Sequence, residues 1–127
     1  MTKSNIVSLT ENYEFLRVYR KGKVYNGRLV VIYLLKRRDK LKRLGITATK
    51  KVGKACIRNR ARRLIYENIR LFMPDIKPGY DIVVVARSSI VAKTFFDVGK
   101  EISYFLKKAD VFMGNARNAG TADSILT

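Results

Sequence analysis

A strongly basic segment that continues into a helical pattern restricts the fold of this chain more than any other feature. Residues 50–63 hold seven Lys or Arg and no Asp or Glu. Positive charge at the start of a helix opposes the helix dipole by about 0.3–1 kcal/mol for each badly placed charge. Because these charges are unfavourable for the helix itself, they indicate that the segment binds a partner with a high density of negative charge. Apolar residues spaced about 3.6 apart predict the helix over Ala55–Met73, and Pro74 ends it. These residues are Ile57, Ala61, Leu64, Ile65, Leu71 and Phe72.

The remaining apolar patterns predict one mixed domain over residues 1–113. Expected strands are Arg28–Leu35, Leu44–Thr49 and Tyr80–Ala86, with a short additional strand near Lys23–Tyr25. Expected helices are Glu11–Arg20, capped by Thr10, and Phe95–Ala109, capped by Thr94. The order α-β-β-β-α-β-α is typical of an α+β sandwich, in which helices pack on a single sheet. Residues 114–127 are small and polar, which predicts a disordered tail.

Composition narrows the function. The formal net charge of +17 over 127 residues points to nucleic acid or an anionic membrane surface. The absence of histidine removes the commonest general base and a frequent metal ligand. The single cysteine, Cys56, excludes an internal disulfide and suits a reducing compartment; we interpret it as a small buried residue. The longest apolar run, residues 29–35, is too short to span a bilayer, so we expect a cytoplasmic protein without a membrane partner.

The side of the basic helix opposite its apolar stripe has the chemistry of a phosphate-binding surface. Asn59, Arg63, Tyr66 and Arg70 lie on this outer side. Arg58, Arg60 and Arg62 flank it, and Lys50 and Lys51 precede the helix. Guanidinium groups bind phosphate oxygens in pairs and stack on bases. The alternative is a solvated charged face, but such a face normally mixes signs, and the first acid in this helix is Glu67. The pattern therefore favours nucleic acid. We expect RNA rather than DNA on physiological grounds and not from any base-reading pattern, since the sequence has neither a recognition-helix motif nor a zinc finger.

A second candidate site combines the first helix with the first long strand. Phe15 and Tyr19 share one face of that helix, and Val30 and Ile32 share one face of the strand. If the helix lies along the sheet, these side chains form a cleft with aromatic walls, on which single-stranded nucleic acid stacks readily. The alternative, which the residues alone favour, is that all four belong to the ordinary core.

Nothing in the chain supports a self-contained active site. The ten acidic residues are scattered, and no glycine-rich phosphate loop is present. We interpret Asp39, Asp75 and Asp81 as caps or turn residues.

The run Lys50–Arg70, centred on Arg58-Asn59-Arg60, closely resembles the signature of the bacterial ribonuclease P protein subunit. Residues 45–47 and 80–86 and the rings of Phe15 and Tyr19 extend the resemblance, which covers roughly residues 9–109. It implies a two-layer sandwich like that of the second domain of a ribosomal protein, with a left-handed β-α-β crossover. The general rule for such crossovers predicts the right hand.

The resemblance also implies a function. In this family an RNA subunit carries out the magnesium-dependent cleavage that removes the 5′ leader from precursor transfer RNA, and no protein partner is required. The basic helix binds the catalytic RNA, and the leader passes through the cleft of Phe15, Tyr19, Val30 and Ile32. This chain departs from the family at Tyr66, where many members have arginine, and at Ile32, where an aromatic residue is frequent. The alternatives are a ribosomal-type RNA-binding module without a role in cleavage and, less favoured, a stand-alone nuclease.

Overall fold

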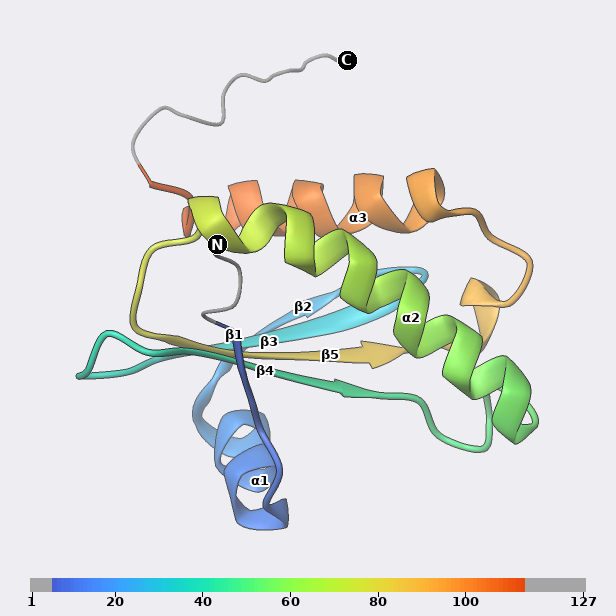
Figure 1. Cartoon of the computed structure of the whole chain (residues 1–127), viewed down its shortest axis with the longest axis horizontal. Coiled ribbons are helices and arrows are strands. Elements are labelled where there is room, and N and C mark those ends of the chain that lie inside the picture. The colour runs from blue at the N-terminus through green and yellow to red at the C-terminus, as the bar shows by residue number, and fades with distance from the viewer. Residues whose placement is uncertain (1–5, 114–127) are drawn as a thin grey trace.

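The computed structural model describes residues 6–113, which form a five-stranded mixed sheet with three α-helices (Figure 1). The strands are β1 Ile6–Ser8, β2 Lys23–Asn26, β3 Val30–Lys36, β4 Lys42–Thr47 and β5 Tyr80–Ala86. The α-helices are α1 Asn12–Lys21, α2 Ala55–Phe72 and α3 Phe95–Lys108. Two short 3-10 helices, η1 Met73–Asp75 and η2 Ser88–Ile90, follow α2 and β5. The predicted disordered tail lies outside the described residues.

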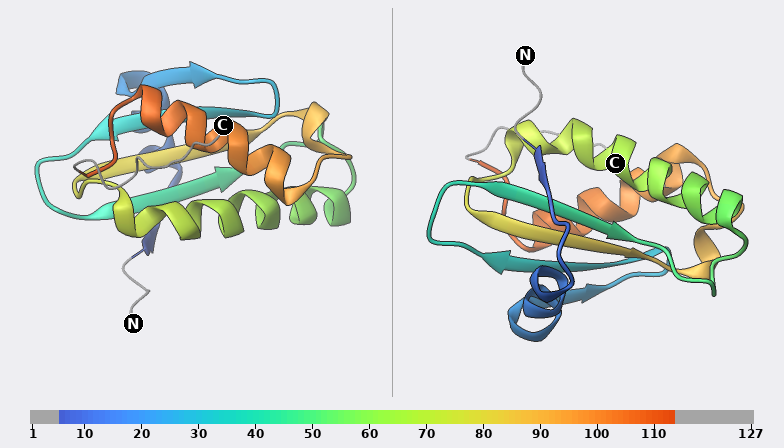
Figure 2. Two further views of the ribbon diagram at one scale, coloured as in Figure 1. Left: turned by 90° about the horizontal axis from the view of Figure 1, so that it is seen from above. Right: turned by 60° about the horizontal axis from the view of Figure 1, so that its bottom comes forward.

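The strand order is β1-β4-β5-β3-β2, with β5 in the centre as its apolar sequence predicts. β5 pairs parallel with β4 and antiparallel with β3, and α2 makes the connection from β4 to β5. The left view of Figure 2 looks from the side of α2 and α3, and in it β4 points to the right with β5 above it. When this view is turned so that both strands point up, β5 lies to the left of β4. The crossover is therefore left-handed, as the family resemblance implies and against the general rule.

Alternation along the strands divides the apolar residues between the two faces of the sheet. Val30, Ile32 and Leu34 of β3 face α2 and α3 and belong to the main core. The helices contribute residues that are fully buried: Ile65, Ile69, Val98, Ile102 and Leu106. The helix α1 lies against the opposite face and encloses a smaller cluster around Val18 and Val83 (Figure 1). The two-layer sandwich is thus the sheet with α2 and α3, and α1 covers part of the other face.

The helix starts differ in how they are capped. Thr94 caps α3 as predicted, because its hydroxyl accepts from Asp97 N at 3.2 Å and Asp97 Oδ2 accepts from Thr94 N at 3.0 Å. The prediction that Thr10 caps α1 is wrong. Glu11 is the N-cap, and Glu14 Oε1 accepts from the backbone N–H groups of Glu11 and Thr10 at 3.1 and 3.0 Å. A carboxylate three residues into the helix holds its start in both cases.

Other boundaries shift by one or two residues. β1 has no counterpart among the predicted strands, since three residues are too few to show alternation. β4 begins at Lys42 rather than Leu44 and ends at Thr47, where the chain turns toward α2.

The burial of three residues in α2 differs from expectation. Leu71, expected on the buried side of α2, is 58% exposed, and Cys56 is exposed rather than buried. Asn68, by contrast, is buried. Its side-chain amide donates to Leu64 O at 3.0 Å and to Phe95 O at 3.1 Å, and the second hydrogen bond links α2 to the start of α3.

Candidate nucleic-acid interface

The start of α2 is built unlike those of α1 and α3. Its N-cap is Lys54, whose side chain makes no capping hydrogen bond, and its first turn contains no acid. Both α1 and α3 instead begin with a capping box closed by a carboxylate. The first backbone N–H groups of a helix point outward and attract anions when no side chain satisfies them. The start of α2 therefore combines free helix donors with basic side chains.

The predicted outer side of α2 is exposed, as its spacing requires. Ala61, Ile65 and Ile69 are buried against the sheet, whereas Asn59, Arg60, Arg63 and Arg70 are exposed and Tyr66 is 39% exposed. Lys50 and Lys51 are exposed on the turn between β4 and α2. The nine predicted RNA-binding residues thus occupy one helix and the turn that precedes it.

Some of these side chains are held by neighbours and others are not. Arg62 Nη1 donates to Asn59 Oδ1 at 2.6 Å, and Arg70 Nη2 pairs with Glu67 Oε1 at 2.8 Å. Arg58 is half-buried, and its Nε has no hydrogen-bond partner within the described part of the chain. Arg60 and Arg63 form no ion pair with any other residue of 6–113. Arg60 and Arg63 therefore offer guanidinium groups whose positive charge is not neutralised by a carboxylate.

Three aromatic rings meet where α1 crosses the sheet. The centroid of Tyr19 lies 6.4 Å from that of Phe15 and 4.8 Å from that of Tyr33 on β3. All three side chains are half-buried, so part of each ring remains accessible. We call Phe15, Tyr19 and Tyr33 the ring cluster.

Val30 and Ile32 do not line this site, and the prediction that they share a cleft with Phe15 and Tyr19 is wrong. Both are fully buried on the opposite face of the sheet, beneath α2 and α3. A shift of one residue along a strand moves a side chain to the other face. The residues of β3 that point toward α1 are Val31, Tyr33 and Leu35. The departure from the family noted at Ile32 accordingly concerns a core position.

The alternation of polar and apolar residues in β4 is the sequence signal that would have placed Tyr33 on the face of the sheet toward α1. In β4, Leu44 and Ile46 alternate with Arg43, Gly45 and Thr47, so the apolar pair marks the core face. The register aligns Gly45 of β4 with Val83 of β5, and Val83 with Tyr33 of β3. Tyr33 therefore belongs to the face that carries Arg43 and Thr47, away from the core.

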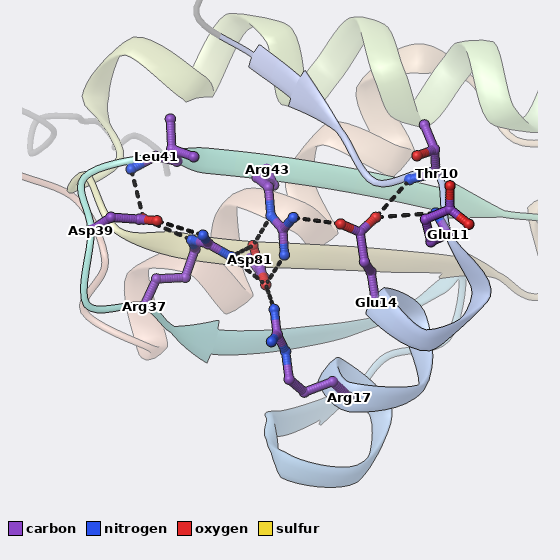
Figure 3. Close-up of polar contacts among 9 residues, drawn as sticks. All are labelled: Thr10, Glu11, Glu14, Arg17, Arg37, Asp39, Leu41, Arg43 and Asp81. Carbon is purple, nitrogen blue, oxygen red and sulfur yellow. Dashed lines mark hydrogen bonds and ion pairs between the residues drawn. The ribbon is translucent and has the colours of Figure 1, made fainter.

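A buried carboxylate holds the same face of the sheet together beside α1 (Figure 3). Asp81 is fully buried on β5, which corrects its interpretation as a turn residue. Arg43 donates to it from Nε at 2.8 Å and from Nη2 at 3.0 Å. Arg37 Nη1 lies 3.2 Å from both carboxylate oxygens, and Arg17 Nη2 lies 3.7 Å from Oδ2. Side chains from α1, from β4 and from the turn after β3 therefore converge on Asp81.

This network is balanced in charge and is structural. Arg43 Nη1 donates to Glu14 Oε2 at 2.7 Å, and Arg37 Nε donates to Asp39 Oδ1 at 2.8 Å. Three guanidinium groups thus face three carboxylates. The hydrogen bond from Arg37 lowers the pKa of Asp39 to about 2, and the backbone N–H groups of Glu11 and Thr10 lower the pKa of Glu14. Because its charges are mutually satisfied, the network is a poor site for an external phosphate.

Comparison with known proteins decides the family. A family model described as Ribonuclease P matches residues 4–110. The chain belongs to the ribonuclease P protein family. It is 45% identical over 105 residues to the ribonuclease P protein component of Clostridium botulinum, a match that covers 82% of this chain and 95% of the relative. It is 46% identical over 104 residues to that of Clostridioides difficile, covering 81% and 91%.

Solved structures of ribonuclease P proteins share the fold. The Staphylococcus aureus protein superposes with a TM-score of 0.75 at 33% identity, covering 83% of this chain and 96% of that one. The Thermotoga maritima protein gives 0.72 at 30% identity, covering 80% and 96%. The chain is accordingly a subunit of an endoribonuclease that works with an RNA subunit, and the ribosomal-type alternative is not favoured. Within residues 6–113, no helix has the length and apolar character needed to cross a membrane.

Proposed function

We propose that α2 and the turn before it bind the catalytic RNA subunit of ribonuclease P. The observation that carries this proposal is the start of α2, where free helix donors, exposed arginines and the absence of acids coincide. Lys50, Lys51, Arg60 and Arg63 supply charge for phosphates, and bidentate guanidinium contacts fix the register of the RNA backbone. Tyr66 lies in the same outer row, where its half-exposed ring offers a surface for a base or a sugar.

We further propose that the 5′ leader of precursor transfer RNA passes over the ring cluster. Its three half-exposed rings provide stacking surfaces that accept any base. β4 supports the continuity of the path, since Gly45 lies beneath Phe15 and the strand leads through Thr47 to Lys50 and Lys51. A strand of RNA on the ring cluster can therefore continue toward the basic start of α2.

The magnesium ions required for cleavage belong, in this proposal, to the RNA subunit. The chain has no histidine, and within residues 6–113 no three carboxylate or thiol side chains are grouped to hold a metal. Glu14, Asp39 and Asp81 bind arginines instead. The protein contributes by neutralising phosphate charge around the RNA. This lowers the mutual repulsion of the phosphate groups, which the magnesium ions would otherwise have to screen. We place this activity in the cytoplasm.

One reconstitution tests the proposal. Precursor transfer RNA is incubated with magnesium and the catalytic RNA of the same organism at limiting salt, with and without the chain. We expect the protein to accelerate removal of the 5′ leader, and more strongly for precursors with long leaders. Unchanged cleavage would contradict the proposal, and cleavage by the protein without RNA would indicate a stand-alone nuclease.

A further inference from the structure

The outer side of α3 carries aromatic and basic residues in strict alternation. Phe96, Lys100, Tyr104 and Lys108 follow one another at intervals of four residues, and we call them the α3 ladder. Phe96 is 76% exposed and Tyr104 is 58% exposed. Val98, Ile102 and Leu106, on the side toward the sheet, are fully buried. The ladder therefore takes no part in the main core.

The acids near the α3 ladder are already bound within the protein. Glu101 accepts hydrogen bonds from three consecutive backbone N–H groups, those of Arg28, Leu29 and Val30, at 3.1, 2.8 and 2.9 Å. Asp97 accepts from Thr94 in the capping box of α3. Lys100 and Lys108 form no ion pair with another residue of the described chain. The positive charge of the ladder is thus left for an external partner.

Two further features suit the ladder to nucleic acid. The Lys108 Nζ lies 5.7 Å from the centroid of the Tyr104 ring, so charge and stacking surface are combined at one position. Beside the ladder, a hollow of about 860 Å³ lies between α3 and the turn from β2 to β3. Arg28, Lys93, Lys100 and Tyr104 are among its lining residues. The hollow extends the basic and aromatic character of the helix to its neighbouring turn.

We propose that the α3 ladder binds a single-stranded segment of the catalytic RNA. Four residues of α-helix rise about 6 Å, so the two rings lie about 12 Å apart along the helix with one lysine between them and one beyond. This arrangement presents stacking surfaces and phosphate contacts by turns, which is how single strands are bound without reading their sequence.

The position of α3 selects the RNA subunit rather than the leader. α3 packs beside α2 in one layer, and α1 lies on the other face of the sheet (Figure 1). The ring cluster belongs to the apolar cluster beneath α1. An RNA that contacts α2 can reach the α3 ladder without leaving this layer. This inference rests on the proposed role of α2 in binding the same RNA.

The test compares binding of the catalytic RNA by the full chain and by a variant with Phe96→Ala and Tyr104→Ala. We expect the dissociation constant to rise by about fivefold or more, since each ring that is removed takes away the stacking of one base. Tyr13→Ala is the matched control, because Tyr13 is 66% exposed on α1, across the sheet. It should leave the affinity unchanged, and Tyr104→Phe, which keeps the ring, should retain it. Thermal unfolding of each variant separates loss of binding from loss of fold.

Two other arms fix the meaning of each outcome. Lys100→Gln with Lys108→Gln should reduce the slope of log affinity against log salt by about 0.7 for each phosphate that the variant no longer neutralises. If the ring variant binds the catalytic RNA as wild type does, the inference is overturned. It is also overturned if the only change in the variant is that its affinity for precursor transfer RNA no longer depends on leader length. Arg63→Ala is measured in parallel. If it also binds normally, the proposed role of α2 fails; if it alone is impaired, only the α3 ladder fails.

Discussion

The ring of Phe15 stands over Gly45 of β4, in the space that a larger residue's side chain would fill. A Cβ atom built on Gly45 would lie 2.7 Å from Phe15 Cζ and 3.1 Å from Leu9 Cδ1. The missing side chain allows α1 to approach the sheet closely enough for Phe15 to join Tyr19 and Tyr33. Glycine at this position therefore sets the geometry of the ring cluster.

Gly45→Ala should displace Phe15 from the ring cluster. The added methyl group overlaps the ring, and overpacking of this kind lowers the free energy of unfolding by about 1–3 kcal/mol. We expect weaker affinity for precursors with long leaders and a smaller effect on leaderless RNA. Urea denaturation and binding measurements with both substrates check this outcome. Ile46→Val, at the neighbouring position facing the main core, is the control: it should cost about 0.5–1.5 kcal/mol without changing the dependence on leader length.

Tyr33→Ala tests which face of β3 contacts the leader. Tyr33 packs on Tyr19 at 4.8 Å, so its removal should weaken binding of long leaders while the main core stays intact. Ile32→Val changes the adjacent residue, which is fully buried on the other face. We expect it to cost about 0.5–1.5 kcal/mol of stability and to leave leader binding unaltered. A loss of leader affinity in Ile32→Val but not in Tyr33→Ala would instead place the leader on the face of Ile32.

Asp81→Asn should destabilise the protein strongly. The substitution removes the charge that neutralises Arg43 and Arg37, and breaking a buried ion pair by removing one partner costs about 3–5 kcal/mol. Chemical denaturation at neutral pH measures the effect. Asp39→Asn, which removes a half-exposed partner of Arg37, should cost far less because water screens that pair. Equal losses in the two variants would show that Asp81 is not the centre of the network.

The predictions from sequence succeed where periodicity is long and fail where a choice between two equivalent patterns is needed. The strand Tyr80–Ala86 and the cap at Thr94 are confirmed, since a run of apolar residues interrupted only by Asp81 and a capping box are distinctive local signals. Val30 and Ile32 do share one face of this strand, as predicted, in β3. The face that meets α1 is wrong, because both halves of this strand are apolar and only the neighbouring β4 distinguishes them.

The role of Asp81 escaped prediction for a different reason. Its partners come from α1, β4 and the turn after β3, and no spacing along the chain reveals that they meet. Asn68 is similar, because its polar side chain is satisfied by the carbonyl groups of Leu64 and Phe95. Buried polar residues are placed by tertiary hydrogen bonds, whereas hydrophobic periodicity places the rest.

Arg63→Ala should weaken binding of the catalytic RNA at every salt concentration tested. Arg63 is exposed and has no ion-pair partner among residues 6–113, so its replacement removes a phosphate-binding group without disturbing the fold. The slope of log affinity against log salt should fall by about 0.7–0.9. Arg70→Ala is the comparison, because Arg70 is paired with Glu67 at 2.8 Å and part of its charge is already neutralised. We expect the smaller change for Arg70, and the reverse order would contradict the assignment.

Acid should destabilise the turn after β3 within a defined range of pH. Arg37 lowers the pKa of Asp39 to about 2 in the folded protein, from an ordinary value of about 3.9. A lowered pKa means that the ionised form is favoured by folding, so this contribution is complete above about pH 4 and is lost as the pH falls through about 2. Melting temperatures of wild type and Asp39→Asn should therefore differ most above pH 4 and converge toward pH 2. A difference that stays constant down to pH 2 would show that the ion pair with Arg37 does not stabilise the fold.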